Sequence, residues 1–271
     1  MISKIEGFIE SRDVKIHYIA KKFKDINHPS FLFVPGIMMP AWIWENQLEY
    51  FSKNYNVVAM EPRSQGDSSQ SCEGHYAFSM AKDIQAVIQT LDLKSVVLIG
   101  WSIGVPQVIN YAAHFKLKNL VGLVLIDGIV GTDPSLSFYQ SMVDYWTEFQ
   151  MDRISNTEKF IKSLFKQDQK ESFFKKLNAI ALRTPTNTVM TLINNYIQQD
   201  FRALLPHIDT PTFIATIDGP RLGYMQDMHR LLPNSHMEVF QSAGHALFVD
   251  QAERFNRSME TFIENQILPH F

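Results

Sequence analysis

The sequence has little cysteine and no recognisable metal-binding pattern. Its 271 residues include one cysteine, Cys72, which excludes a disulfide within the chain, a Cys-x-x-Cys redox pair and a zinc site built from several cysteines. Cys72 lies in a polar stretch, and we expect it to have no part in the chemistry. A His-Glu-x-x-His motif is absent as well, so the sequence predicts no metal site.

The glycine patterns that bind nucleotide cofactors are also missing. No two glycines are separated by a single residue, which excludes the Gly-x-Gly-x-x-Gly fingerprint of dinucleotide sites. No glycine precedes a lysine, which excludes a phosphate-binding loop of the Walker type. Together with the missing metal pattern, these absences predict a protein that works without a cofactor.

Long apolar runs and a surplus of positive charge are absent too. No run approaches the roughly 18 apolar residues of a membrane span, and the first residues lack the apolar stretch of a signal peptide. The chain has 25 lysines and arginines against 28 aspartates and glutamates, so nothing favours binding to nucleic acid. We therefore expect a soluble cytoplasmic protein with no membrane span and no nucleic-acid partner. Its oligomeric state stays open at this point.

Short apolar runs alternate with helical patterns along most of the chain. Hydrophobic residues make up 45% and charged residues 20%, a composition that excludes intrinsic disorder. Continuous apolar runs are typical of parallel strands covered on both faces, and here they predict a hairpin of 8–10 and 14–19, then strands at 31–34, 57–60, 96–99, 120–126, 213–217 and 238–240. Helical periods predict helices at 80–91, with Ser79 as N-cap, and at 103–115, 222–232 and 252–265. The alternation predicts an α/β fold with a mostly parallel sheet.

One segment, residues 129–206, breaks this alternation. It contains no convincing strand but carries aromatic residues at helical spacing. A helical excursion between two strands is most simply a cap over the ends of the sheet. The sequence therefore predicts a core made of residues 1–128 and 207–271, with residues 129–206 inserted as a helical cap, or lid.

The clearest chemical motif is Gly100-Trp101-Ser102-Ile103-Gly104, which fits Gly-x-Ser-x-Gly. This pattern carries a nucleophilic serine when it follows a buried strand and opens a helix, because the sharp turn exposes the hydroxyl. The apolar run before it and the helical pattern after it satisfy both conditions. Ser102 is therefore the predicted nucleophile.

The chain resembles the α/β-hydrolase family over essentially its whole length. The resemblance includes the N-terminal hairpin, the Pro35-Gly36 loop, segment 61–68, the serine turn, the cap and segment 243–248. It implies an eight-stranded type of sheet flanked by helices. In that family the last histidine before the C-terminal helix is the general base, and His245 matches this place. A serine hydroxyl needs such an adjacent imidazole to lose its proton at neutral pH.

The acid that would orient this histidine has more than one candidate. The family usually places it beyond the strand at 213–217, where this chain has Pro220, which cannot serve. A minority of relatives carry the acid after the preceding strand, and Asp127 matches that place. Both strand ends lie at the carboxyl edge of the sheet, so either can reach the histidine. We favour Asp127, with Asp218 as the alternative and Asp227 as a poor third choice.

The resemblance also implies an oxyanion hole made of two backbone N–H groups. One is expected from Ile103, just after the nucleophile, and the other from Ile37, with Met38 as the fallback. The loop that contains Ile37 is unusually apolar and suggests a hydrophobic acyl pocket, to which we assign Met38 and Trp101; ordinary core packing is the other interpretation of these side chains.

These residues favour a serine hydrolase that cleaves an ester, thioester or related acyl bond of a small, apolar substrate. A serine in place of an aspartate nucleophile argues against haloalkane dehalogenase or epoxide hydrolase chemistry. Two alternatives remain. The acid after the earlier strand also resembles cofactor-free dioxygenases, in which the histidine abstracts a substrate proton. The missing acid at the usual place suggests instead a non-catalytic, ligand-binding member of the fold.

Overall fold

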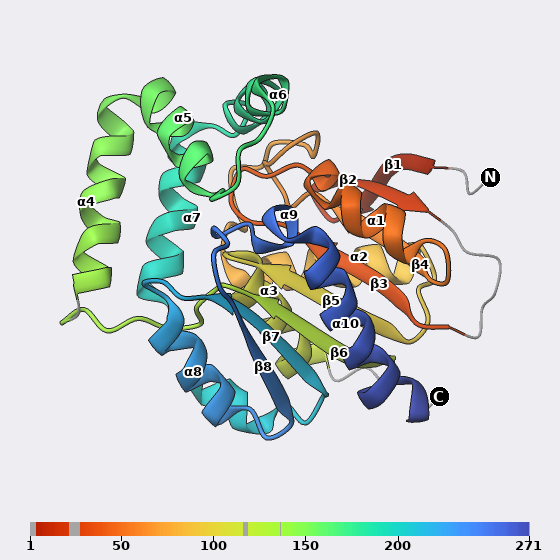
Figure 1. The fold of residues 1–271 in the computed structure, drawn as a ribbon. Helices are drawn as coiled ribbons and strands as arrows, with labels where there is room; N and C mark the ends of the chain where they lie inside the picture. Colours follow the sequence, from red (N-terminus) through yellow and green to blue (C-terminus); the bar gives the residue numbers. More distant parts are fainter. Residues whose placement is uncertain (1–3, 22–27, 116–118, 136, 271) are drawn as a thin grey trace.

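An eight-stranded sheet forms the centre of the molecule (Figure 1). The structure is a computed structural model that describes residues 4–21, 28–115, 119–135 and 137–270. The strand order is β1-β2-β4-β3-β5-β6-β7-β8, antiparallel from β1 to β4 and parallel from β4 onward. The strands are β1 (Lys4–Ser11), β2 (Val14–Lys21), β3 (Ser30–Val34), β4 (Asn56–Met60), β5 (Val96–Trp101), β6 (Leu120–Ile126), β7 (Thr212–Ile217) and β8 (Ser235–Phe240). The predicted α/β fold with a mostly parallel sheet is confirmed.

Helices cover both faces of the sheet, which explains why its strands are continuous apolar runs. One face packs against η1 (Ala41–Trp44), α1 (Glu45–Phe51), α9 (Leu247–Asp250) and α10 (Ala252–Gln266). The other packs against α2 (Ala77–Thr90), α3 (Gly104–Phe115), η2 (Arg202–His207) and α8 (Leu222–Leu231). A last short helix is η3 (Leu268–His270). No helix in the described part of the chain is long and apolar enough to cross a membrane.

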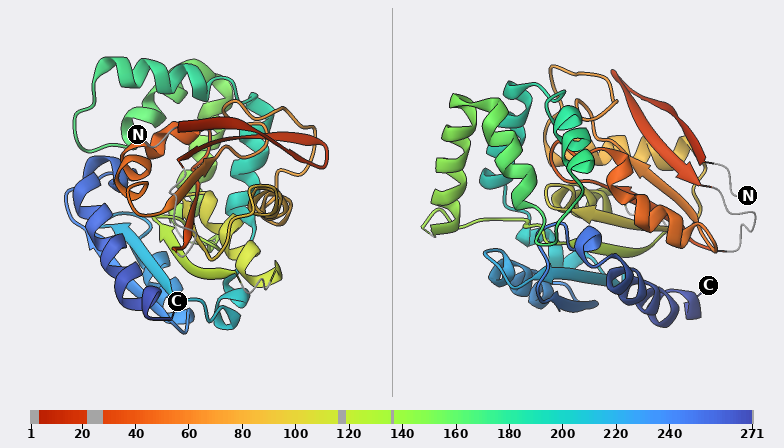
Figure 2. Two further views of the ribbon diagram at one scale, coloured as in Figure 1. Left: turned by 90° about the vertical axis from the view of Figure 1, so that its right-hand side faces the viewer. Right: turned by 45° about the horizontal axis from the view of Figure 1, so that its top comes forward.

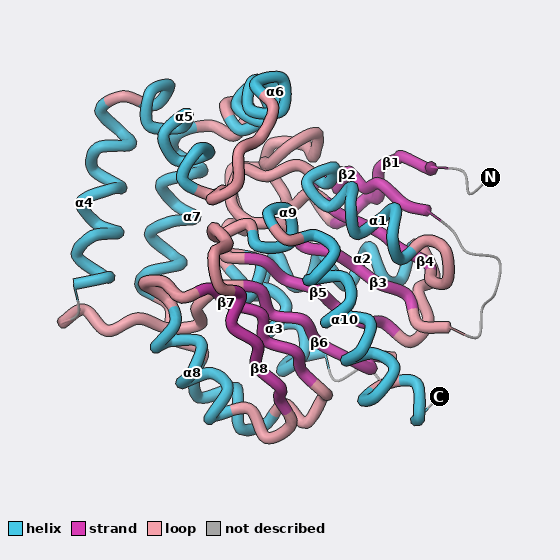
Figure 3. The backbone as a smooth tube through the Cα atoms, in the orientation of Figure 1, coloured by secondary structure: helices cyan, strands magenta, loops and turns pink. Residues whose placement is uncertain are grey.

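Four α-helices follow one another between β6 and β7, ahead of η2 (Figure 3). They are α4 (Ser137–Met151), α5 (Arg153–Ser163), α6 (Glu171–Ala181) and α7 (Thr186–Gln198). Figures 1 and 2 show them grouped beyond the carboxyl ends of the parallel strands. Their buried side chains, such as Phe149 and Leu177, belong to the same apolar cluster as the face covered by α1 and α10. This is the segment expected to form a cap.

Most predicted elements lie where the sequence places them, with one clear error at a helix start. Helix α2 begins at Ala77 with Tyr76 as its N-cap, so Ser79 is not the N-cap residue. Ala77 and Ser79 are both buried, and tertiary packing extends the helix by nearly a turn beyond the local signal. Strand β8 is also longer than its apolar triplet, because it pairs along its whole length with β7.

Candidate active site

Ser102 lies in the turn that joins β5 to α3. Its φ angle is +55°, a left-handed conformation that is strained for any residue but glycine, and its N–H donates to the carbonyl of Ile126 at 2.9 Å. The flanking glycines allow this turn to pack tightly. A Cβ atom at Gly104 would lie 2.7 Å from the carbonyl oxygen of Val34, and one at Gly100 would lie 2.8 Å from that of Gly104.

His245 lies in the loop between β8 and α9, where its backbone is held from two sides. The indole N–H of Trp101 donates to the His245 carbonyl at 3.0 Å, and the N–H of Ala246 donates to the carbonyl of Leu164 in the turn after α5 at 2.8 Å. His245 is only 8% exposed, so its imidazole is almost fully shielded from solvent. The site histidine is thus attached both to the serine turn and to the inserted helices.

Asp127 follows β6 and is fully buried. Its Oδ2 lies 2.6 Å from Nδ1 of His245, and its Oδ1 accepts a hydrogen bond from the hydroxyl of Thr216 at 2.8 Å. Since the carboxylate only accepts, Nδ1 of His245 carries the proton and Nε2 is the basic nitrogen. Of the three acid candidates, the structure brings only Asp127 to the histidine.

The other two carboxylates lie elsewhere. Asp218 is exposed at the end of β7 and is not among the residues that line the cavity of Ser102 and His245. Asp227 lies within α8 and forms an ion pair with Arg230 on the solvent side of that helix. Within the described residues, neither forms a hydrogen bond or an ion pair with His245.

The electrostatics of the pair favour a neutral imidazole beside an ionised carboxylate. Burial and, to a smaller extent, the nearby charge of Arg221 lower the pKa of His245 to about 4, even though Asp127 acts in the opposite direction. Burial alone would raise the pKa of Asp127, but the hydrogen bond from His245 and the Arg221 charge outweigh it, so the pKa of this carboxyl is below its ordinary value. The imidazole is therefore ready to accept a proton at neutral pH.

Ser102 and His245 line the same cavity of about 370 Å³, which is mostly apolar. The remaining lining residues are Ile37, Ile103, Phe138, Met142, Tyr145, Phe160, Ser163, Leu164, Ile193, Tyr196, Ile217, Pro220, Arg221 and Gly244. No hydrogen bond joins the Ser102 hydroxyl to His245 within the described residues, a contact that often tightens only when substrate binds.

Met38 and Trp101, assigned to the pocket from the sequence, are not among its lining residues. Met38 is 1% exposed, and its Sδ lies 3.3 Å from a guanidinium nitrogen of Arg153. Trp101 is equally buried and packs edge-on against Phe248, with its indole N–H already bonded to His245. Both therefore pack in the core around the site, which was the other interpretation of this apolar loop.

The backbone N–H groups of Ile37 and Ile103 lie beside Ser102 and have no acceptor among the described residues. Both residues line the cavity, and a Cβ at Gly36 would lie 3.3 Å from the Ser102 Cβ, so the Ile37 loop touches the serine turn. The N–H of Met38 instead donates to the Gln65 side chain at 2.5 Å. Ile37, and not its fallback, therefore has a donor available.

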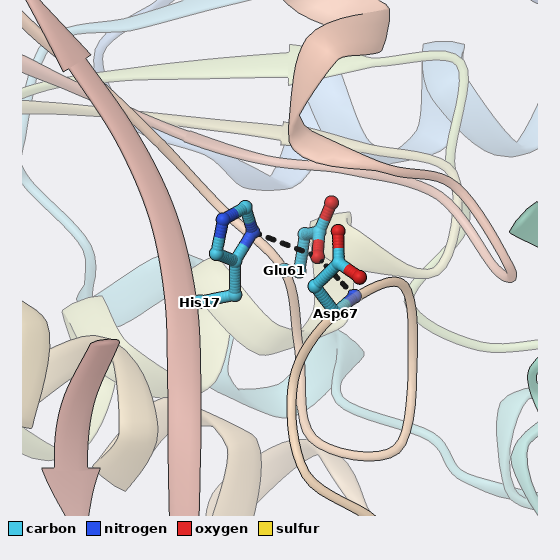
Figure 4. Close-up of side chains that lie close together, drawn as sticks. All are labelled: His17, Glu61 and Asp67. Atoms are coloured by element: carbon cyan, nitrogen blue, oxygen red, sulfur yellow. Dashed lines mark hydrogen bonds and ion pairs between the residues drawn. The ribbon is translucent and has the colours of Figure 1, made fainter. Parts of the chain in front are cut away.

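His17, Glu61 and Asp67 form the one described group whose donor atoms lie close enough to suggest a metal site, within 4.8 Å of one another (Figure 4). Glu61 is already engaged, however. Its Oε2 lies 2.9 Å from Nδ1 of His17 and accepts from the N–H of Asp67 at 2.5 Å, while its Oε1 accepts from the N–H of Ala41 at 2.8 Å. We interpret the cluster as a hydrogen-bond network that stabilises the loop after β4.

Three further residues contribute to the site without having been predicted. Thr216 bonds Asp127, Arg221 lies 3.6 Å from the same carboxylate, and the hydroxyl of Tyr196 accepts a hydrogen bond from the N–H of Ile129. Thr216 could have been suspected from its place at the end of β7, beside β6. Arg221 and Tyr196 carry no local signal, since their approach to the site depends on the packing of α7 and α8.

Comparisons with known proteins agree with this architecture. A family model described as alpha/beta hydrolase fold matches residues 29–252. A protein of Synechocystis named putative non-heme chloroperoxidase is 26% identical over 258 residues, covering 86% of this chain and 90% of that one. A bifunctional esterase/perhydrolase of Acinetobacter calcoaceticus is 23% identical and covers 96% and 100%. The solved structure of an esterase from Exiguobacterium antarcticum superimposes with a TM-score of 0.87 at 20% identity, over 96% of this chain and all of that one.

Proposed function

The chain belongs to the alpha/beta hydrolase family, and from this premise we propose that it is a serine hydrolase that cleaves an ester, thioester or related acyl bond through an acyl-enzyme. One observation carries the proposal. Ser102 and His245 line one apolar cavity, and the ring of His245 is held by buried Asp127 while two unpaired N–H groups lie beside the serine.

In the proposed reaction the Ser102 hydroxyl attacks the substrate carbonyl while Nε2 of His245 takes its proton. The N–H groups of Ile37 and Ile103 would stabilise the negative oxygen that develops on the carbonyl. His245 then returns the proton to the leaving group, which departs and leaves the acyl group on Ser102. Water activated by His245 hydrolyses this ester and restores the enzyme. Asp127 keeps the imidazole oriented and stabilises its charged form.

We also propose that residues 129–206 act as a cap that shapes the substrate pocket. Support comes from the lining of the cavity, because eight residues of this segment line it together with Ser102. They are Phe138, Met142, Tyr145, Phe160, Ser163, Leu164, Ile193 and Tyr196. Pockets of this kind, apolar with a few polar groups, are typical of small-molecule sites. The apolar wall supports a substrate with a hydrocarbon portion.

Turnover of p-nitrophenyl butyrate by wild type and Ser102→Ala tests the proposal. Wild type is expected to release p-nitrophenol well above the uncatalysed rate, and Ser102→Ala to lose at least about 10³-fold in kcat because the nucleophile is gone. Circular dichroism of the variant controls for folding. Unchanged turnover in Ser102→Ala would contradict the proposal. Absence of any turnover in wild type on short acyl esters would favour a non-catalytic binding protein.

Ser102→Ala also distinguishes the hydrolase proposal from the dioxygenase alternative, which the position of Asp127 after β6 favours. In that chemistry His245 removes a substrate proton and no acyl-enzyme forms, so oxygen consumption with a hydroxyquinolone would persist in Ser102→Ala. The name of one relative, the bifunctional esterase/perhydrolase, favours a different variation, perhydrolysis, in which hydrogen peroxide in place of water releases the acyl group as a peracid. Peracid formation from acetate and peroxide would then require Ser102.

A further inference from the structure

A single basic side chain, Arg221, lines the cavity that contains Ser102 and His245. It follows β7 and directly precedes α8, as the N-cap residue of that helix. Its side chain is only 18% exposed. Apart from His245, no other lining residue in the described part of the chain is a histidine, lysine, arginine, aspartate or glutamate.

The guanidinium of Arg221 makes no hydrogen bond within the described residues. Its nearest counter-charge is Asp127, whose Oδ2 lies 3.6 Å from Nε, beyond hydrogen-bond distance. That carboxylate is already used by His245 and Thr216, at 2.6 and 2.8 Å. An arginine carries five N–H donors in a planar fork, so most of the donor capacity of Arg221 remains for something else.

The surroundings make this arrangement costly for a protein with no anionic ligand. Most of the cavity lining, such as Ile193 and Ile217, cannot accept hydrogen bonds, and within the described residues Arg221 makes none with the few lining hydroxyls that can. A partly buried cation in apolar surroundings loses hydration that only a paired, hydrogen-bonded anion restores. The planar arginine fork matches the two oxygens of a carboxylate.

We propose that the substrate carries a free carboxylate in addition to the bond that is cleaved, and that Arg221 binds this carboxylate. The inference rests on the proposed function and names its substrate class, an ester with one anionic end and a hydrocarbon portion. The apolar wall of the cavity then contacts the hydrocarbon, while Arg221 fixes how far the carboxylate lies from Ser102. Arg221 is thereby a residue that determines specificity.

Matched ester pairs test this proposal, since either side of the ester can carry the carboxylate. The first pair is mono-p-nitrophenyl glutarate and p-nitrophenyl 5-methylhexanoate, in which an isopropyl group of similar shape replaces the carboxylate. The second is 4-carboxyphenyl butyrate and 4-isopropylphenyl butyrate. The measurement is the ratio of kcat/KM for the anionic over the neutral ester, in which any effect on the reacting groups cancels.

In at least one pair we expect wild type to prefer the anionic ester and Arg221→Gln to lower the ratio about 10- to 100-fold, the effect of losing a hydrogen bond to a charged group. Arg230→Gln is the control, since Arg230 lies on the exposed side of the same helix and should leave the ratio unchanged. If Arg221→Gln lowers kcat/KM for both members equally, Arg221 merely positions Asp127 and the proposal is wrong.

A binding measurement keeps this result separate from failure of the hydrolase proposal. Calorimetry with glutarate and 4-carboxyphenol uses Ser102→Ala and the double variant Ser102→Ala/Arg221→Gln. If wild type hydrolyses no ester but Ser102→Ala binds one of these carboxylates and the double variant does not, the carboxylate site stands and the hydrolase proposal falls. Absence of binding that depends on Arg221, together with absence of an effect on the ratio, overturns the carboxylate site.

Discussion

After Ser102 and His245, Asp127 is the residue on which the proposed chemistry depends most. It is fully buried and reaches Nδ1 of His245 at 2.6 Å. We predict that Asp127→Asn loses roughly 10³- to 10⁴-fold in kcat for p-nitrophenyl esters, because an amide reverses the tautomer of the imidazole. Asp218→Asn, at an exposed strand end, should stay within about threefold of wild type. A larger loss in Asp218→Asn would transfer the role of the acid to Asp218.

The low pKa of His245 predicts an unusual pH profile. The base works only when neutral, and its pKa of about 4 lies below the ordinary value of 6.5, so kcat/KM should hold through pH 6 and fall only under more acidic conditions. Arg221→Gln removes one of the charges that lowers this pKa and should move the acid limb to higher pH. A limb at pH 6.5 or above in wild type would show that His245 is not the base or is not buried as described.

Sequence reasoning reached some of these residues and missed others for a physical reason. The serine motif is a local feature, since turn, glycines and flanking strand are consecutive, and Asp127 ends an apolar run that is visible in the sequence. Arg221 and Thr216 act through β7 packed beside β6, a register that no local pattern encodes. The sequence predicts Met38 in the pocket, but its side chain is buried outside the cavity. Its left-handed backbone and the hydrogen bond from its N–H to Gln65 depend on the folded structure and leave no trace in the sequence pattern.

At the scale of elements, the turn between β5 and α3 places the nucleophile only if α3 approaches β3 closely. A methyl group at Gly104 would meet the carbonyl oxygens of Val34 and Pro35 at 2.7 and 3.0 Å, and both are backbone atoms that yield little. We predict that Gly104→Ala costs about 1–3 kcal/mol in the free energy of unfolding, measured with urea, and lowers kcat by displacing Ser102.

Gly223→Ala in α8 is the matched control for that substitution. A Cβ at Gly223 would have no neighbour within 4 Å, so the alanine should stabilise the helix by about 0.5–1 kcal/mol. If both variants are stabilised alike, the close approach of α3 to β3 does not constrain the turn.

The order of strands and helices was accessible from the sequence because each element is a continuous run of one pattern. Boundaries were less accessible. Helix α2 starts before Ser79 because buried contacts, and not a side-chain cap, begin it. In segment 129–206, aromatic spacing predicts helices but not the bounds of each, and α7 (Thr186–Gln198) contributes mainly aliphatic side chains such as Val189 and Leu192.

At the scale of the whole molecule, the inserted helices share one apolar cluster with the sheet face under α1 and α10. We therefore predict one cooperative unfolding transition. Phe149→Ala, at a fully buried position of α4, should destabilise the whole protein by about 3–5 kcal/mol, and Met151→Ala, 83% exposed on the same helix, by less than about 0.5 kcal/mol. A separate early transition for the inserted segment, seen by calorimetry, would mean that it folds as a unit of its own.

The central claim is that Ser102 forms a covalent bond with the acyl group, and labelling with a fluorophosphonate followed by mass spectrometry tests it most directly. The account predicts one label per wild-type molecule, located on Ser102, and no label on Ser102→Ala. Ser163→Ala is the control, because Ser163 lines the same cavity but its hydroxyl donates to the carbonyl of Phe160. Equal labelling of wild type and Ser102→Ala would contradict the account.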